Sequence, residues 1–196
     1  MTTQPLITGI HHLALATADI EATLGFWRDL LGFQVVLGYG EGAERQYFLA
    51  LDRHHMITFF EWPQSEPPPY HRPGQAVEGP FGFDHLALEV ASKEGLFVLQ
   101  ERLIEKDFPV TEAVDHGFLT SIYTYDPNHI PVELTWADPA VDLLKNPRFA
   151  GADFSKRAHR HPPGPLEEEP QTAKIIPGGG YELFEVPKKN QEPQGG

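Results

Sequence analysis

Apolar residues in the first 62 positions change their spacing in a way that predicts a strand, a helix and three further strands. Alternation over 7–17 predicts the first strand, and Asp19 is a suitable helix N-cap. The helix is indicated by apolar residues at helical spacing, namely Ile20, Leu24, Trp27 and Leu31, before Gly32. Apolar runs separated by polar or Gly-rich turns, including a turn at 38–42, predict strands at 33–37, 45–51 and 56–62. The predicted order is βαβββ.

The same order returns in the second half of the chain. A strand at 83–90 is followed by Ser92 as a helix N-cap. The second helix carries Leu96, Leu99, Leu103 and Ile104, and strands follow near 109–114, 119–125 and 130–136. The letters repeat as well, because Gly-Ile-His-His-Leu-Ala-Leu at 9–15 returns as Gly-Phe-Asp-His-Leu-Ala-Leu at 82–88. We therefore expect a duplicated unit with one equivalent histidine per copy.

The punctuation of the chain sets its organisation. We expect one domain over 1–136, made of modules at 7–62 and 82–136 that a Pro-rich linker at 63–81 joins. Residues 137–196 form a different region, with nine Pro and seven Gly among 60 residues. This region is either disordered or an extended arm. Its scattered large apolar residues favour an arm that packs on the domain or on a neighbouring subunit.

Composition narrows the chemistry. Among 196 residues there is no cysteine, so His, Asp and Glu are the strong metal ligands that the chain offers. Residues 1–136 hold 19 acidic and 7 basic side chains, a balance that repels nucleic acid. No apolar run of membrane-spanning length and no export signal is visible, so we expect a cytoplasmic protein that acts on a small molecule.

The two repeated histidines and one glutamate make a candidate metal site. In a strand, His12 shares a face with Ala14, and His85 shares a face with Ala87, so each imidazole has space beside it. Glu133 is a lone carboxylate in an apolar strand that we expect to lie close by. Imidazole and carboxylate suit Fe(II), Mn(II), Zn(II) or Ni(II), and three such ligands leave coordination positions open for substrate.

Over 7–136 the chain resembles the vicinal oxygen chelate superfamily. Besides the two His-Leu-Ala-Leu strands, the motifs that carry the resemblance are Phe-Trp-Arg-Asp-Leu-Leu-Gly-Phe at 26–33, and Asp-Pro-Asn-His at 126–129 before Val-Glu-Leu at 132–134. The resemblance implies an α+β fold in which two tandem βαβββ modules form a glyoxalase/extradiol-dioxygenase-like half-barrel cavity. It maps the metal ligands onto His12, His85 and Glu133, with His11 on the face opposite His12.

The resemblance leaves the reaction open, and the number of protein ligands is one criterion. Glyoxalase-like members usually add a fourth ligand from the last strand of the first unit. Alignment of 55–59 with 129–133 puts Phe59 at that position, and the 73-residue offset puts Phe60 there. Neither binds metal. Glu61 could do so only if the strand pairing slips.

Extradiol dioxygenases in this superfamily use three protein ligands and add acid-base residues, and counterparts of these exist here. His71 lies 14 residues before His85, and Tyr123 lies ten before Glu133. His116 resembles a further second-sphere histidine of that class. Histidine titrates in the range needed to move protons during cleavage of a catechol ring.

We therefore favour an extradiol-type ring-cleaving dioxygenase that uses Fe(II) on a catechol-like diol, in a homodimer. A glyoxalase-like lyase, isomerase or epimerase that uses Zn(II), Ni(II) or Mn(II) is the alternative. A non-catalytic binding protein of the bleomycin-resistance type is the third reading. The sequence leaves open whether the cavity closes within one chain or across a dimer.

Overall fold

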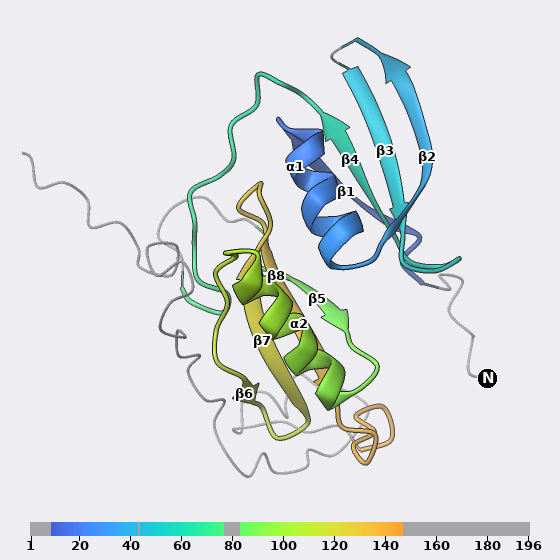
Figure 1. Ribbon diagram of the computed structural model, residues 1–196. Helices are drawn as coiled ribbons and strands as arrows, with labels where there is room; N and C mark the ends of the chain where they lie inside the picture. The colour runs from blue at the N-terminus through green and yellow to red at the C-terminus, as the bar shows by residue number, and fades with distance from the viewer. Residues whose placement is uncertain (1–8, 43, 77–82, 147–196) are drawn as a thin grey trace, which may run out of the picture. The chain divides into compact units, whose positions relative to one another are not determined.

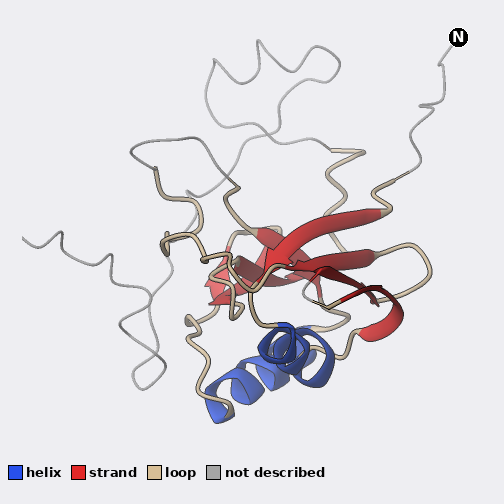
Figure 2. Cartoon of the chain, turned by 90° about the horizontal axis from the view of Figure 1, so that it is seen from above, coloured by secondary structure: helices blue, strands red, loops and turns tan. Residues whose placement is uncertain are grey.

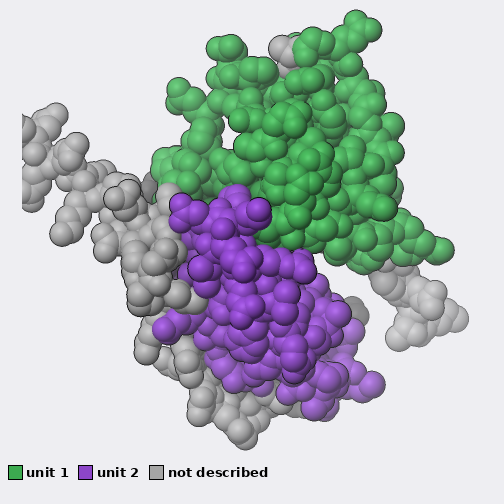
Figure 3. Space-filling model, in the orientation of Figure 1, with its two compact units in different colours: residues 1–70, 125–130 green, residues 71–124, 131–196 purple. Residues whose placement is uncertain are grey.

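The computed structural model describes residues 9–42, 44–76 and 83–146, and it divides the chain into two compact units (Figures 1 and 3). Unit 1 comprises residues 1–70 and 125–130, and unit 2 comprises residues 71–124 and 131–196. Most of the predicted arm at 137–196 lies outside the described residues, so its packing stays a prediction.

Unit 1 has the predicted βαβββ order. Its elements are β1 His12–Thr17, α1 Ile20–Leu24, the π-helical turn η1 Gly25–Leu30, β2 Gln34–Glu41, β3 Glu44–Ala50 and β4 Met56–Glu61. The strands form one sheet in the order β1-β4-β3-β2, in which only β1 and β4 are parallel. Asp19 caps α1 as predicted, because its Oδ1 accepts the Ala22 N–H at 3.0 Å.

The core of unit 1 is centred on Trp27 of η1. Its ring is fully buried and lies 5.9 Å from that of Phe59 on β4, centroid to centroid. The indole N–H donates to Oδ2 of buried Asp126 at 3.0 Å. Asp126 lies in the turn 125–130, which joins β7 to β8 but belongs to unit 1. Burial raises the pKa of this carboxyl above its usual range.

One strand of unit 1 differs from the prediction. β2 continues to Glu41, through the Gly-rich stretch that predicted a turn at 38–42. Gly40 has a φ of +104°, and a Cβ there would lie 2.1 Å from the carbonyl oxygen of Glu44. Glycine is needed at this position because the neighbouring backbone approaches closely, so it does not end the strand.

Unit 2 repeats the order in a second sheet. Its elements are β5 Leu86–Glu89, α2 Lys93–Glu105, β6 Val114–Asp115, β7 Leu119–Tyr125 and β8 Pro131–Ala137, in the sheet order β5-β8-β7-β6. Ser92 caps α2 as predicted, and its Oγ accepts the Gly95 N–H at 3.0 Å. The helices lie apart from the strands, as the α+β class requires (Figure 2).

Two strands of unit 2 are shorter than predicted. The strand expected at 109–114 reduces to β6 and a single bridge between Val110 and Thr124. The strand expected at 83–90 begins only at Leu86, so His85 lies immediately before β5. Within the described parts of the chain, no helix is long and apolar enough to cross a membrane.

Candidate metal and acid-base site

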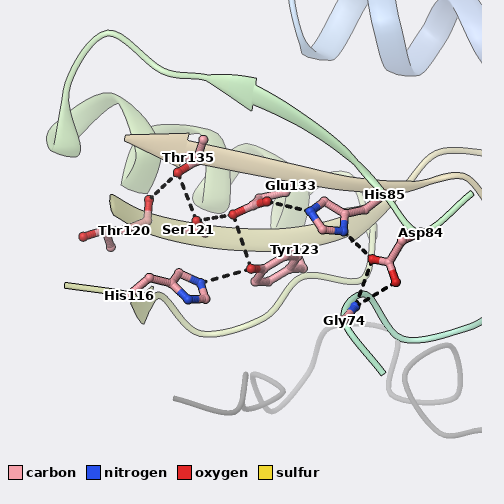
Figure 4. Close-up of polar contacts among 9 residues, drawn as sticks. All are labelled: Gly74, Asp84, His85, His116, Thr120, Ser121, Tyr123, Glu133 and Thr135. Atoms are coloured by element: carbon pink, nitrogen blue, oxygen red, sulfur yellow. Dashed lines mark hydrogen bonds and ion pairs between the residues drawn. The ribbon is translucent and has the colours of Figure 1, made fainter. Parts of the chain in front are cut away.

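Glu133 is the centre of a polar cluster in unit 2 (Figure 4). It lies on β8, opposite Ala87 of β5, and its side chain is buried. Its Oε2 lies 2.9 Å from Nε2 of His85, so two of the three predicted metal ligands face each other. The small Ala87 side chain leaves this pair uncrowded on the sheet face.

His85 has a second carboxylate on its other ring nitrogen. Nδ1 contacts Oδ1 of Asp84, and Oδ1 also accepts the Gly74 N–H at 2.9 Å. The hydrogen bond with Glu133 and then that with Asp84 raise the pKa of His85 to about 9. The positive charge of His71 is among the effects that lower the pKa of Asp84, so this predicted residue lies within electrostatic range of the cluster. The two carboxylates favour a cation between them.

The other oxygen of Glu133 accepts two hydroxyl groups. The Ser121 hydroxyl donates to Oε1 at 2.5 Å and the Tyr123 hydroxyl at 3.3 Å. Ser121 Oγ also lies 3.0 Å from Oγ1 of Thr135. Burial raises the pKa of Glu133, but the hydrogen bonds from His85 and Ser121 outweigh it, so the pKa falls below its ordinary value. Glu133 is therefore an ionised carboxylate.

Tyr123 links this carboxylate to His116. Nε2 of His116 lies 3.1 Å from the Tyr123 hydroxyl. Because the phenol proton points to Glu133, the phenol oxygen accepts from His116. Burial, followed by the negative charge of Glu133, raises the pKa of Tyr123, which keeps the phenol protonated. The cluster thus holds a protonated phenol between an imidazole and a carboxylate.

The third predicted ligand, His12, lies in unit 1 at the start of β1. Its ring is exposed, its centroid is 5.6 Å from that of Phe48, and its Nδ1 lies 2.9 Å from Nδ1 of His11. The expectation that His11 turns away from His12 is therefore wrong for the side chain. His11 is the residue that contacts the His12 ring.

The sheet register identifies the unit 1 counterpart of Glu133. Ala87 pairs with Glu133, and Ala14, its repeat equivalent, pairs with Thr58. Alignment to Phe59 or Phe60 was therefore wrong, because the loops before the last strand differ in length between the copies. Thr58 is fully buried, and its hydroxyl oxygen accepts Nε2–H of Gln46 at 2.9 Å.

Glu61 is held away from this position. It lies three residues after Thr58 on β4, so it projects from the opposite face of the sheet. Its carboxylate is bound at both oxygens by Arg45, with Nε–Oε2 at 2.6 Å and NH2–Oε1 at 2.8 Å. A fully committed ion-pair partner is not available as a metal ligand.

The donor chemistry around Glu133 fits a divalent metal. Two donors bound to one first-row ion at about 2.1 Å and at right angles lie about 3 Å apart. The separation of His85 Nε2 and Glu133 Oε2 agrees with this. Among the described residues, no group of three or more His, Asp or Glu side chains is arranged to hold an ion, and His12 belongs to the other unit. The three-ligand set stays a prediction.

Sequence reasoning missed two members of the cluster. Ser121 could have been found by alternation, since it lies two residues before Tyr123 on the same strand and therefore on the same face. Asp84 could have been found from the repeat, because it precedes His85 as His11 precedes His12.

Comparison with known proteins identifies the relatives of this chain. The model of the Glyoxalase/Bleomycin resistance protein/Dioxygenase superfamily matches residues 9–134. An iron-dependent extradiol dioxygenase of Rhodococcus jostii (strain RHA1) is 25% identical over 140 residues, 64% of this chain and 42% of that protein. A 1,2-dihydroxynaphthalene dioxygenase of Pseudomonas sp. (strain C18) is 26% identical over 157 residues, 77% of this chain and 45% of that protein. The chain thus spans less than half the length of these dioxygenases.

Other relatives match over nearly their whole length. The uncharacterised protein YwkD of Bacillus subtilis (strain 168) is 30% identical over 132 residues, 66% of this chain and 97% of that protein. A glyoxylase/bleomycin resistance protein/dioxygenase domain from Frankia sp. EAN1pec is 20% identical, with a TM-score of 0.57 over 69% of this chain and 96% of that one. A glyoxalase family protein from Enterococcus faecalis is 23% identical, with a TM-score of 0.51 over 67% of this chain and 99% of that one. These structural matches establish the fold.

Proposed function

Because the chain belongs to the Glyoxalase/Bleomycin resistance protein/Dioxygenase superfamily, we propose that it is a metal-dependent enzyme, namely an extradiol-type ring-cleaving dioxygenase. Its substrate would be a catechol-like aromatic diol, and its ligands would be His12, His85 and Glu133. Fe(II) is the favoured ion, and Mn(II), Zn(II) and Ni(II) are alternatives. Similarity to two dioxygenases, at 25% and 26% identity, supports this class.

The observation that carries the proposal is the residue at the position of a fourth ligand. Glyoxalase-like members place a ligating side chain on the last strand of the first module, whereas this chain has Thr58 there, bound by Gln46. A neutral hydroxyl in a hydrogen bond is a poor ligand for these ions. Three protein ligands leave the coordination positions that a diol and O2 both need.

The protein's own residues supply the proton chemistry. A bound divalent ion would bring the two vicinal oxygens of the diol and O2 together. A catechol must lose a proton when it binds, and a proton must be returned during ring opening. Tyr123 and His116, in contact at 3.1 Å, are positioned as one acid-base pair for these transfers. His71, near Asp84, is the second predicted acid-base residue.

The test is oxygen uptake by anaerobically prepared, Fe(II)-loaded full-length protein given a panel of catechols. Uptake that depends on both diol and protein is expected, and Glu133→Ala should abolish it. No uptake with any diol, from protein that has bound iron, would exclude this reaction for the panel. Homodimer formation stays a prediction, which the mass of the metal-loaded protein in solution tests.

A glyoxalase-like lyase, isomerase or epimerase is the second candidate. It is favoured by chain length, because the relative matched over 97% of its length is of two-module size, unlike the dioxygenases. Such an enzyme would move a proton on the carbon beside a carbonyl group. Deuterium exchange at that carbon with Zn(II)- or Ni(II)-loaded protein, without oxygen uptake, would identify it. Ligand binding with neither reaction would indicate the binding protein.

A further inference from the structure

Both candidate histidine ligands have a hydrogen-bonding partner on Nδ1, and in each module that partner is the preceding residue. Nδ1 of His12 lies 2.9 Å from Nδ1 of His11. Nδ1 of His85 contacts Oδ1 of Asp84 (Figure 4). Positions 11 and 84 are equivalent in the repeat, as are 12 and 85. The same backbone position therefore serves both imidazoles, with a different side chain in each copy.

The start of each strand explains why adjacent side chains can meet. Inside a strand, successive side chains project from opposite faces and do not touch. His12 is the first residue of β1, and His85 lies just before β5, so strict alternation has not begun at either pair. Both pairs occupy the same point of the repeated fold, which gives the two contacts a common structural origin.

We propose that His11 and Asp84 are positioning residues that hold the two ligand histidines with Nδ1–H bonded and Nε2 directed to a divalent cation. The inference rests on the ligand set of the proposed function. A partner on one ring nitrogen fixes the ring orientation and leaves the other nitrogen as the donor to metal. Nε2 of His85 faces Glu133 at 2.9 Å, as this role requires.

The two positioning residues differ in charge. Asp84 is a carboxylate, itself anchored by the Gly74 N–H at 2.9 and 3.2 Å, and it accepts from Nδ1–H strongly. His11 is an imidazole that can accept only through an unprotonated nitrogen. Asp84 should therefore strengthen its ligand more than His11 does, and exchange of the residue types should move metal affinity in opposite directions.

The His11–His12 contact makes a prediction that needs no metal. One proton lies between the two Nδ1 atoms, and the proposal places it on His12. The reverse arrangement would leave the proton of neutral His12 on Nε2, where it blocks metal binding. Nitrogen NMR of ¹⁵N-histidine-labelled, metal-free full-length protein distinguishes the two tautomers. We expect the Nδ1–H tautomer of His12 in the wild type, with a shift toward Nε2–H in His11→Ala. A His12 tautomer that is Nε2–H, or that His11→Ala leaves unchanged, overturns the role of His11.

Metal affinity tests Asp84 and the charge difference, with Zn(II) and Mn(II) as calorimetric probes. Asp84→Ala should weaken binding by about 10- to 100-fold, the usual effect of losing a partner of a ligating histidine. Asp84→Asn should lose less, because its amide oxygen still accepts Nδ1–H. His11→Ala should lose less than Asp84→Ala, and His11→Asp should bind more tightly than the wild type.

Asp52→Ala is the matched control. Asp52 also accepts from a histidine ring nitrogen, Nδ1 of His55 at 2.9 Å, but neither residue is a candidate ligand. Its loss should leave metal affinity unchanged. If His85→Ala abolishes metal binding while Asp84→Ala and His11→Ala behave like the control, the positioning roles are wrong and the ligand set stands. If the wild type binds neither ion, the ligand set fails, and the tautomer measurement still decides the arrangement at His11 and His12.

Discussion

The two units share a sheet order and an initial histidine, but their polar residues differ at the position that decides the chemistry. In unit 2 the last strand offers Glu133, to which Ser121 and Tyr123 donate. In unit 1 the same register position holds Thr58, bound by the neutral side chain of Gln46. The duplication therefore preserved the scaffold and not the functional groups, and only unit 2 carries a carboxylate-centred acid-base cluster among the described residues.

The carboxylates of the two units are also compensated differently. Glu61 in unit 1 has a permanent cation, the guanidinium of Arg45. Glu133 in unit 2 is paired with His85, whose charge depends on a proton. A buried carboxylate is costly unless its charge is matched. A proton can be exchanged for a metal ion, whereas a guanidinium cannot, so unit 2 is the one built for an exchangeable cation.

The largest expected effect separates Glu133 from its counterpart. Glu133→Ala should weaken Zn(II) or Mn(II) binding by more than the roughly 100-fold that loss of an outer partner produces, because a ligand itself is removed. Thr58→Ala should bind both ions as the wild type does. Calorimetry on the two variants measures this. Equal losses would contradict a carboxylate role confined to unit 2.

A smaller effect is expected when the acid-base function is removed but the ligands remain. Tyr123→Phe should retain bound metal and slow turnover by about 10² to 10⁴, the range for a lost proton-transfer group. Metal analysis together with the turnover number checks this. His116→Ala should slow turnover in the same direction, because it removes the partner of the phenol. Metal loss in Tyr123→Phe would instead place this residue among the groups that hold the ion.

Arg45 tests the other half of the comparison through stability. Arg45→Ala leaves the buried Glu61 carboxylate without its cation, which should lower the free energy of unfolding by about 1–3 kcal/mol. Urea denaturation of the metal-free protein measures it. The double variant Arg45→Ala/Glu61→Ala should recover part of the loss. As a control on function, Glu61→Gln should keep wild-type metal affinity, and weaker binding there would restore Glu61 as a ligand.

The smallest expected effect is the pH response of the metal-free protein. The pKa of His85 is about 9 in the folded state and about 6.5 in an unfolded chain. Its contribution to stability is therefore complete below about pH 6.5 and disappears as the pH rises through 9. NMR titration of His85 and unfolding curves between pH 6 and 10 check this. Asp84→Asn should lower the pKa, and a titration near 6.5 in the wild type would show that the carboxylates do not hold the proton.

The sequence predicted the features that local physics controls. Asp19 and Ser92 announced their helices because a cap is a local hydrogen bond, and the repeat announced the duplicated fold. The extension of β2 was missed because Gly38 and Gly40 are typical of turns, and only close packing of β3 explains them in a strand. Thr58 was missed because register depends on loop lengths and cross-strand pairing, which letters alone do not specify.

The most direct test of the central claim is oxygen uptake by the Fe(II)-loaded protein after anaerobic addition of a catechol, compared between the wild type and Glu133→Ala. The account predicts one iron per chain, one O2 consumed per diol cleaved in the wild type, and neither iron nor uptake in the variant. Wild-type protein that holds iron and consumes no O2 with any diol would contradict the account, as would uptake that Glu133→Ala leaves unchanged.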